Sequence, residues 1–349
     1  MPTAPVDTTT SPPKSAELET PRVSVVMPFR NAGKFLAEAL ASLTAQTYPR
    51  LEILAIDDGS DDDGPAIVSA AAARDPRIVL VREGRRGFVP SLNRGIELAR
   101  GEFIARMDAD DICMPDRFAK QVAFLDANPS VGVVGGQIVP IIESAEARRV
   151  ARPQWWLETP LAHDDIVRSL PTRNSIYHPT AMLRRDVVVA AKGYRPAFVV
   201  VQDYDLWLRL AERTQLANLP DRVLQYRFHV EQATQKNVEQ AYFCTWAARH
   251  AARERRAGRA DPIIEGIAID RAQVSSWGLS GDEADDQISW IRATQRARTH
   301  LLAGRRVRAL GAIIGLFLRR PATVLRRVGL AVRTRARRHG GAGPRTASA

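Results

Sequence analysis

Cysteine is scarce in this chain of 349 residues: Cys113 and Cys244 lie far apart and in unrelated contexts. Two such residues supply neither a disulfide framework nor the ligand spacing of a zinc site. The first 21 residues lack the apolar core of a signal peptide and are rich in Pro, Thr, Ser and Ala, which predicts a disordered tail. Both absences favour a protein of the reducing cytosol.

Acidic residues are missing from the C-terminal part of the chain. Residues 291–349 contain fifteen arginines and no Asp or Glu. The whole chain has 50 basic and 39 acidic residues, a formal net charge of +11, so the remainder has 35 basic and 39 acidic residues and a net charge of −4. The positive charge therefore belongs to a C-terminal appendage, for which we expect an anionic surface as partner.

Long hydrophobic runs are missing as well. The ten apolar residues 309–318, flanked by arginines, are too few to span a bilayer. After Pro321 an apolar stripe faces away from the arginines, the pattern of an interfacial helix (Val324, Leu325, Val328, Ala331, Val332). We expect residues 304–349 to form a basic amphipathic tail that holds the protein at the inner face of the plasma membrane. The alternative is a polybasic arm for nucleic acid, which would leave the apolar stripe without a purpose.

What the chain does have is an alternation of short strands and amphipathic helices. Strands are predicted at residues 23–27, 51–56, 78–81 and 102–107, and helices at 35–43, 90–100 and 117–127. In chain order this is β-α-β-β-α-β-α, typical of an α/β fold with a mostly parallel sheet flanked by helices. Ligands of such sheets bind outside the carboxyl ends of the strands.

Beyond residue 139 the alternation weakens. Residues 131–139 predict a strand, 203–213 a helix and 222–228 an edge strand. The pattern of residues 231–303 is helical and polar. We therefore expect a catalytic domain at 22–230, a helical C-terminal extension at 231–303 and the basic tail after it.

Three carboxylates crowd the end of the predicted strand 102–107: Asp108, Asp110 and Asp111. Like charges so close repel and are costly to desolvate unless a cation compensates them, and oxygen ligands favour Mg²⁺ or Mn²⁺. Since residues i and i+2 project the same way from an extended chain, Asp108 and Asp110 can converge on one ligand. Asp111 is expected to cap the following turn. In isolation the cluster could also be a solvent-facing helix cap.

Six short motifs resemble those of family 2 of the glycosyltransferases, which have the GT-A (Rossmann-like) fold and transfer a sugar from a nucleotide diphosphate with inversion. In family order they are residues 23–28 with Asn31, 46–48, 56–60, 101–104, 108–111 and 202–207. The resemblance covers about residues 21–230. It implies a nucleotide-diphosphate sugar donor, with UDP favoured, and a glycan or lipid-linked acceptor in bacterial cell-surface polysaccharide synthesis.

For the nucleotide, the resemblance implies that the acidic loop after the second strand binds the base. Asp58, with Asp57 second, suits an imide N–H because a carboxylate is a pure acceptor. The loop at Pro28 would lend backbone groups to the base and leave Phe29 and Arg30 near the nucleotide. A solvated turn is the alternative for residues 57–63.

For the metal, the resemblance assigns Asp108 to the ribose and metal surroundings and Asp110 to direct coordination of Mn²⁺ or Mg²⁺. The cation neutralises the diphosphate as it leaves, where negative charge grows in the transition state. His229 resembles a family element near the metal or pyrophosphate, although a lone histidine is more often structural. His178 stands where family members line the acceptor side.

Inversion by direct displacement needs one base to take the proton of the acceptor hydroxyl. In the family this base lies in a Glu-Asp pair at the start of a helix, here replaced by Gln202-Asp203. The resemblance therefore implies that Asp203 is the base, without an acidic neighbour to raise its pKa. Asp205 is the reserve candidate, and a plain helix N-cap is the alternative for Asp203.

Two other functions stay open. A nucleotidyltransferase would share the nucleotide site but needs a basic phosphate-gripping loop, for which the first strand–helix turn offers only Arg30, Gly33 and Lys34. A catalytically idle nucleotide- or membrane-binding adaptor would keep the fold, although the candidate catalytic aspartates are present. Nucleic acid is not expected as a partner.

Overall fold

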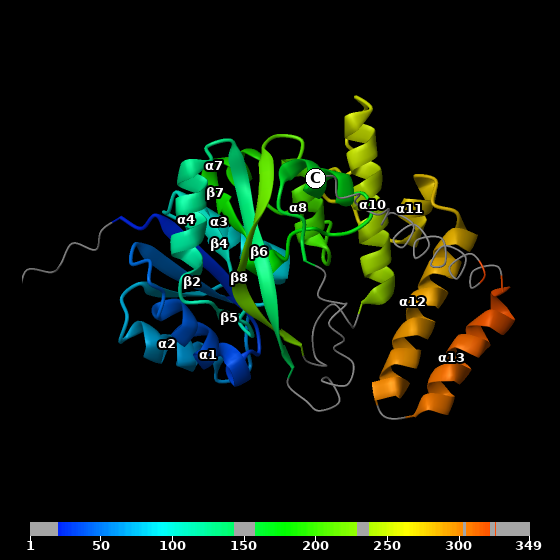
Figure 1. The fold of residues 1–349 in the computed structure, drawn as a ribbon, viewed down its shortest axis with the longest axis horizontal. Helices are drawn as coiled ribbons and strands as arrows, with labels where there is room; N and C mark the ends of the chain where they lie inside the picture. Colours follow the sequence, from blue (N-terminus) through cyan, green and yellow to red (C-terminus); the bar gives the residue numbers. More distant parts are fainter. Residues whose placement is uncertain (1–19, 143–157, 229–236, 303–304, 322–324, 326–349) are drawn as a thin grey trace, which may run out of the picture.

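The computed structural model describes residues 20–142, 158–228, 237–302, 305–321 and 325 (Figure 1). Residues 1–19 of the tail predicted at residues 1–21 lie outside these ranges, as does the predicted basic tail after residue 321 except for Leu325. His229 lies outside them too.

The described residues form one central sheet of eight strands (Figure 1). The strands are β1 Val23–Phe29, β2 Leu51–Asp57, β3 Ile78–Arg82, β4 Phe103–Arg106, β5 Ile112–Cys113, β6 Val131–Ile142, β7 Met182–Arg184 and β8 Gln215–Phe228. Their order across the sheet is β3-β2-β1-β4-β7-β6-β8-β5. The pairs β2–β3, β1–β2, β1–β4 and β6–β8 are parallel, whereas β7 is antiparallel to both neighbours and β5 is antiparallel to β8.

The register of the parallel strands places the candidate residues at one edge of the sheet. Phe29 at the end of β1 is opposite Asp57 at the end of β2, and Val26 is opposite Arg106 at the end of β4. The side chains of β1 and β2 are buried along their whole length, as expected for parallel strands covered on both faces. The loops that follow β1, β2 and β4 therefore meet at the same edge.

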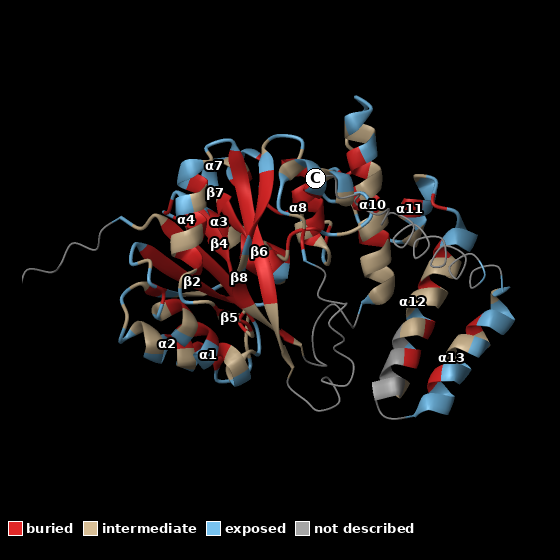
Figure 2. Ribbon diagram, in the orientation of Figure 1, coloured by how far each residue is buried: buried red, intermediate tan, exposed pale blue. Residues whose placement is uncertain are grey.

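Helices cover both faces of the sheet, and Figure 2 shows the buried strands between them. The helices α1 Gly33–Thr44, α2 Gly64–Ala72 and α4 Arg117–Ala127 pack with one hydrophobic cluster. The helices α3 Phe88–Leu98, α6 His163–Ser169, α7 Arg185–Ala190 and α8 Gln202–Leu210 pack with the other. The predicted α/β fold, with a mostly parallel sheet flanked by helices, is confirmed.

In the described part of the chain after the sheet, four helices follow one another: α10 Val238–Arg256, α11 Arg271–Ser276, α12 Gly281–Leu302 and α13 Arg306–Arg319. Their presence confirms the predicted C-terminal helices. The apolar side of α10 is buried in the same cluster as Trp207 of α8. Beyond α10, α12 and α13 lie side by side on the side away from the sheet (Figure 1). Among the described helices, none is both long and apolar enough to cross a bilayer.

Three details of the predicted element order are wrong. Helix α2, between β2 and β3, was not predicted because the run of aspartates before it is typical of a loop. In the structure these residues start the helix: Oδ1 of Asp62 accepts the backbone N–H of Gly64, and Pro65 lies in the first turn. Residues 222–228 are not an edge strand, because β5 pairs with Leu224 and Gln225 of β8. Helix α8 ends at Leu210 and not at residue 213, and β8 begins at Gln215 and not at residue 222.

Candidate functional site

The acidic cluster lies directly after β4. Asp108, Asp110 and Asp111 each bring one carboxylate oxygen to within 4.8 Å of the other two. Asp108 and Asp110 are partly exposed, whereas Asp111 is buried. Three oxygen ligands at this separation suit a divalent cation such as Mg²⁺ or Mn²⁺. The donor set therefore fits the predicted metal, and these residues could hold it.

A buried cation, Arg106, stands beside the cluster. Its side chain is 2% exposed, and its Nη2 lies 2.6 Å from Oδ1 of Asp108. Its Nε and Nη1 are buried and have no hydrogen-bond partner among the described residues. Arg106 was not among the predicted site residues, although the strand alternation that pairs Asp108 with Asp110 also puts Arg106 on the same side. One of the like charges is therefore already compensated by the protein.

Asp111 does not cap the following turn as predicted. Its Oδ1 accepts the backbone N–H of Arg227 on β8 at 2.8 Å, and its Oδ2 is buried without a hydrogen-bond partner among the described residues. Burial, with Asp108 and Asp110 nearby, raises the pKa of Asp111 well above its ordinary value. A cation bound to the cluster would favour the ionised carboxylates. Asp111 thus belongs to the possible ligand set.

Arg227 ties β8 to the cluster. Its Nε donates to the backbone oxygen of Asp110 at 2.6 Å, its Nη2 lies 2.5 Å from Oε2 of Glu38 on α1, and its guanidinium lies 4.6 Å from the centre of the Phe35 ring. The loop after β4 is therefore fixed from two sides. Nothing in the local sequence pattern around Asp108 pointed to Arg227, which is more than 100 residues away.

The acidic loop after β2 is held by its own side chains. Oδ1 of Asp58 accepts the backbone N–H groups of Arg86 and Gly87 at 2.8 and 2.7 Å, and Oδ1 of Asp57 accepts that of Ser60 at 2.9 Å. Asp57 and Asp58 are 5% and 6% exposed, so the solvated-turn alternative does not describe them. Their contact with a nucleobase stays a prediction. One oxygen of Asp58 already fixes the loop that leads into α3.

At the end of β1, Pro28 and Phe29 are buried and Arg30 is exposed. The Phe29 backbone oxygen accepts the N–H of Asp58 at 3.0 Å. The ring of Phe29 packs in the core, so this residue offers only backbone to a ligand. The structure thus brings the predicted nucleotide residues to one edge, where the loops after β1 and β2 are hydrogen-bonded to each other.

Asp203 lies in the first turn of α8. It is not the helix N-cap, since that position is Val201, which has the strained backbone angles φ 64° and ψ 20°. Asp203 is half-buried, and its Oδ2 accepts a hydrogen bond from Nδ2 of Asn174 at 2.6 Å. Burial raises the pKa of Asp203, and the hydrogen bond from Asn174 opposes this. A raised pKa makes the carboxylate a better proton acceptor.

Asp205, the reserve candidate, is fully committed elsewhere. It is 1% exposed and forms ion pairs with Arg195 and with Arg209, whose Nε lies 3.0 Å from Oδ2 of Asp205. Its oxygens therefore cannot serve an acceptor hydroxyl without breaking a buried ion pair. Asp203 is left as the candidate base on this helix.

His178 is 9% exposed and packs inside the protein. Its Nε2 lies 2.8 Å from the hydroxyl of Tyr194, and its ring meets those of Trp207 and Phe88 edge-on. Burial lowers the pKa of His178 well below its ordinary value, with a further contribution from Arg106, so the imidazole is neutral at physiological pH. Its predicted place on the acceptor side stays a prediction.

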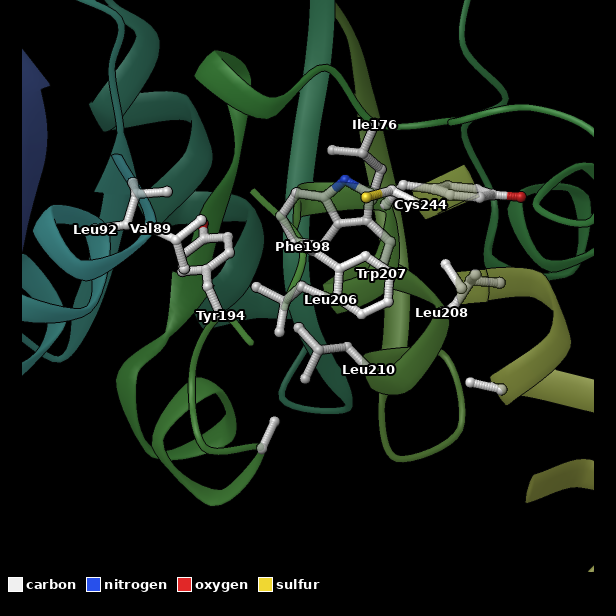
Figure 3. Packing of buried hydrophobic residues seen from close by; sticks show 14 of the residues in the cluster. Val89, Leu92, Ile176, Tyr194, Phe198, Leu206, Trp207, Leu208, Leu210 and Cys244 are labelled. Carbon is white, nitrogen blue, oxygen red and sulfur yellow. The ribbon is translucent and has the colours of Figure 1, made fainter. Parts of the chain in front are cut away.

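The helix that carries Asp203 is anchored by its apolar side. Figure 3 shows Trp207 of α8 among Ile176, Phe198 and Leu206, with Tyr194 nearby. These side chains are buried, and Trp207 is 0% exposed. The rigid packing below α8 holds its first turn, and with it Asp203, in a fixed position.

The chain is similar in sequence to known proteins. The sequence model described as "Glycosyl transferase family 2" matches residues 24–190. The O-antigen biosynthesis glycosyltransferase WbnJ of Escherichia coli is 31% identical over 229 residues, which are 64% of this chain and 85% of that protein.

Two solved structures resemble the chain in fold. The mannosyltransferase PcManGT from Pyrobaculum calidifontis, in complex with GDP-Man and Mn²⁺, is 21% identical with a TM-score of 0.52, covering 86% of this chain and 88% of that one. S. aureus TarS 1-349, in complex with UDP-GlcNAc, is 16% identical with a TM-score of 0.51, covering 82% and 89%. At these identities the likeness shows the fold alone.

Proposed function

The chain belongs to glycosyltransferase family 2 and is a glycosyltransferase; on this basis we propose that it transfers a sugar from a nucleotide-diphosphate donor with inversion. One observation carries the proposal. Burial raises the pKa of both Asp108 and Asp203, and the positive charge of Arg106 opposes this rise for each of them, so the candidate metal cluster and the candidate base lie within electrostatic reach of the same side chain. A single displacement requires a general base close to the site that binds the diphosphate.

In the proposed reaction Asp203 takes the proton of the acceptor hydroxyl as its oxygen forms a bond to the anomeric carbon. The bond from that carbon to the diphosphate oxygen breaks on the opposite face, and the nucleoside diphosphate leaves with its electron pair. Asn174, 2.6 Å from Oδ2 of Asp203, orients the carboxylate. Burial of Asp203 supports this role, because it raises the affinity of the carboxylate for a proton.

The proposed cofactor is Mn²⁺ or Mg²⁺, held by Asp110 with Asp108, and with Asp111 within reach. When bound, the cation supplies compensation for the charge of the departing diphosphate. The oxygens within 4.8 Å of one another support this proposal, as does the Mn²⁺ in the complex of PcManGT. Arg106 would keep one oxygen of Asp108 oriented while the other carboxylates face the ion.

For the donor we propose a UDP-sugar, with the base near Asp57 and Asp58 and the backbone of Pro28, Phe29 and Arg30. The complex of TarS with UDP-GlcNAc supports a uridine nucleotide, whereas that of PcManGT with GDP-Man makes a guanosine nucleotide the competitor. The name of WbnJ supports an acceptor in bacterial cell-surface polysaccharide synthesis, either a glycan or a lipid-linked glycan. Such an acceptor would be met at the cytoplasmic face of the membrane.

The test is the release of nucleoside diphosphate from a panel of UDP- and GDP-sugars, with Mn²⁺ or Mg²⁺ and with candidate glycan acceptors. Asp203→Asn should keep donor binding and lose about 10²- to 10⁴-fold in turnover. Asp110→Ala should lose metal-dependent donor binding. The matched control is Asp186→Asn, an exposed aspartate in the first turn of α7, which should be as active as the wild type.

Three outcomes would count against the proposal. Full activity of Asp203→Asn would show that Asp203 is not the catalytic base. Release of pyrophosphate from a nucleoside triphosphate and a sugar phosphate would identify a nucleotidyltransferase instead. Donor binding without turnover across the whole panel would favour the adaptor.

A further inference from the structure

The outer face of α13 is an exposed apolar surface. Five large side chains on this helix are 42% to 85% exposed: Val307, Leu310, Ile314, Phe317 and Leu318. At 3.6 residues per turn their spacing puts them on one side of the helix. A contiguous exposed apolar stripe is unusual on a monomeric protein and marks an interaction site. We name these five residues the α13 stripe.

The opposite side of α13 is already used. Leu316 is buried against Ala293 and Trp290 of α12, and Ala309 on the same side of α13 is buried as well. Nη1 of Arg320, just after α13, lies 3.0 Å from Oδ1 of Asp286 on α12. The hairpin of α12 and α13 is thus held together by one side of α13, and Figure 2 shows most of the remaining surface of this helix exposed. The α13 stripe is not needed to hold the hairpin.

The charges around the stripe identify the kind of partner. Arg306 and Arg308 at one end of the helix and Arg319 at the other are exposed, as is Arg305 just before it. No Asp or Glu occurs in the sequence after Asp286. An apolar stripe bordered by arginines complements a bilayer whose headgroups are anionic, in which the apolar side chains enter the interface and the guanidinium groups meet phosphates.

We propose that the α13 stripe docks the protein on an anionic lipid bilayer, with α13 lying in the plane of the interface. A second copy of the chain fits less well, because each copy would bring the same row of arginines and no acidic residue to the contact. The helix of 14 residues is about 21 Å long at 1.5 Å per residue. It suits an interfacial position rather than a crossing.

The hairpin would place the catalytic domain close to the bilayer, since α12 contacts α10 and α10 packs against α8. This inference goes beyond sugar transfer and does not depend on it. Lipid docking is measured without donor or acceptor, so its failure and the failure of the proposed reaction are separate results.

The first test is flotation of the full chain with vesicles of equal parts phosphatidylcholine and phosphatidylglycerol. The variant Leu310→Ser/Ile314→Ser/Phe317→Ser should lower the partition constant about tenfold or more, because three apolar side chains no longer enter the interface. The control Val189→Ser/Ile264→Ser changes two residues that are 54% and 68% exposed elsewhere, and it should float like the wild type. Vesicles of phosphatidylcholine alone should bind the wild type more weakly.

Two outcomes of flotation would overturn the proposal. One is that the wild-type protein does not float with the anionic vesicles. The other is a triple variant that floats as well as the wild type, which would assign docking to another part of the chain. Because the three substituted side chains lie on the exposed face, circular dichroism should show an unchanged helix content.

The second test locates the lipid contact. The native cysteines, Cys113 and Cys244, are both buried, so Leu310→Cys can be labelled selectively with a polarity-sensitive fluorophore. Anionic vesicles should shift its emission to the blue, whereas the same label at Ile264→Cys should not shift. A blue shift without vesicles that grows with protein concentration, together with a dimer in gel filtration, would assign the stripe to a second copy and refute lipid docking.

Discussion

Replacing Asp111 by Asn should stabilise the metal-free protein. The carboxyl group of Asp111 is buried beside two other carboxylates, and its Oδ2 has no hydrogen-bond partner in the described part of the chain. Asn has nearly the same shape, and its Oδ1 can still accept the N–H of Arg227. The folded wild type either carries a third negative charge there or takes up a proton, and Asn bears neither cost.

The size of the effect follows from the geometry. Two unit charges 4.8 Å apart repel by about 3.5 kcal/mol at an effective dielectric constant of about 20. Arg106, 2.6 Å from Asp108, offsets part of this repulsion, so we expect a gain of about 1–3 kcal/mol in the free energy of unfolding. An unfolding entropy of about 2.1 cal/mol/K per residue gives about 0.7 kcal/mol/K for 349 residues, and hence a Tm higher by about 1.5–4 °C.

The gain depends on pH in a defined direction. The folded-state pKa of Asp111 is raised, so the wild type loses stability relative to the variant as the pH rises through that pKa. At acid pH, below the pKa of the unfolded carboxyl group, both states carry the proton and the difference vanishes. The advantage of Asp111→Asn should therefore be larger at about pH 8 than at about pH 5.5.

Thermal unfolding followed by fluorescence, in EDTA and in Mn²⁺, measures the effect. Mn²⁺ should raise the Tm of the wild type more than that of the variant, because the cation offsets the charge that the variant lacks. The control is Asp116→Asn: the pKa of this half-exposed carboxylate is lowered by its hydrogen-bonded ion pair with Lys120, so the substitution should bring no gain in stability. If Asp111→Asn were less stable than the wild type in EDTA at both pH values, the buried carboxyl group of Asp111 would not be a source of instability.

Three further substitutions test other contacts. Asn174→Ala removes a hydrogen bond that lowers the pKa of Asp203, so the acid limb of kcat/KM should move to higher pH; an unmoved limb would contradict the base assignment. Asp205→Ala removes the buried carboxylate that pairs with Arg195 and Arg209 and should lower the free energy of unfolding in urea by about 3–5 kcal/mol. A loss below about 1 kcal/mol would show that this carboxylate is not needed to stabilise the two arginines. Gly95→Ala puts a Cβ 2.3 Å from Cγ1 of Val26 and should cost about 1–3 kcal/mol, part of which Val26→Ala should restore in the double variant.

The elements that the sequence predicted are those with a local pattern. β1, β2 and β4 are short apolar runs, and α4 follows its helical spacing to the residue. β5 has two residues and forms only because β8 offers it a partner, so no local signal could identify it. The same pairing turned the predicted edge strand into an internal one. Helix α2 was missed for a different reason, since the turn-forming aspartates before it obscured its alanine-rich sequence.

The candidate site divides in the same way. The spacing of Asp108 and Asp110 predicted a convergent pair, and the structure brings their oxygens together with that of Asp111. Arg106 could have been found from the same alternation along the strand. Asn174 could not, because it precedes Asp203 by 29 residues and reaches it only after the chain has folded around α8. Contacts between distant segments leave no periodic trace in a sequence.

The C-terminal helices help to position the candidate base. Arg195 joins Asp205 of α8 to Asp261, which follows α10 and lies 2.9 Å from Nη1 of Arg195. Arg249 of α10 donates to the hydroxyl of Tyr204, the residue next to Asp203, at 2.9 Å.

These contacts add to the apolar packing of α10 against α8, where the side chains of both helices lie in one buried cluster. Because α12 contacts α10, packed side chains and ion pairs connect the hairpin of α12 and α13 with the first turn of α8. Since the position of Asp203 depends on that turn, the extension supports the proposed active site as well as carrying the surface that we propose for the membrane.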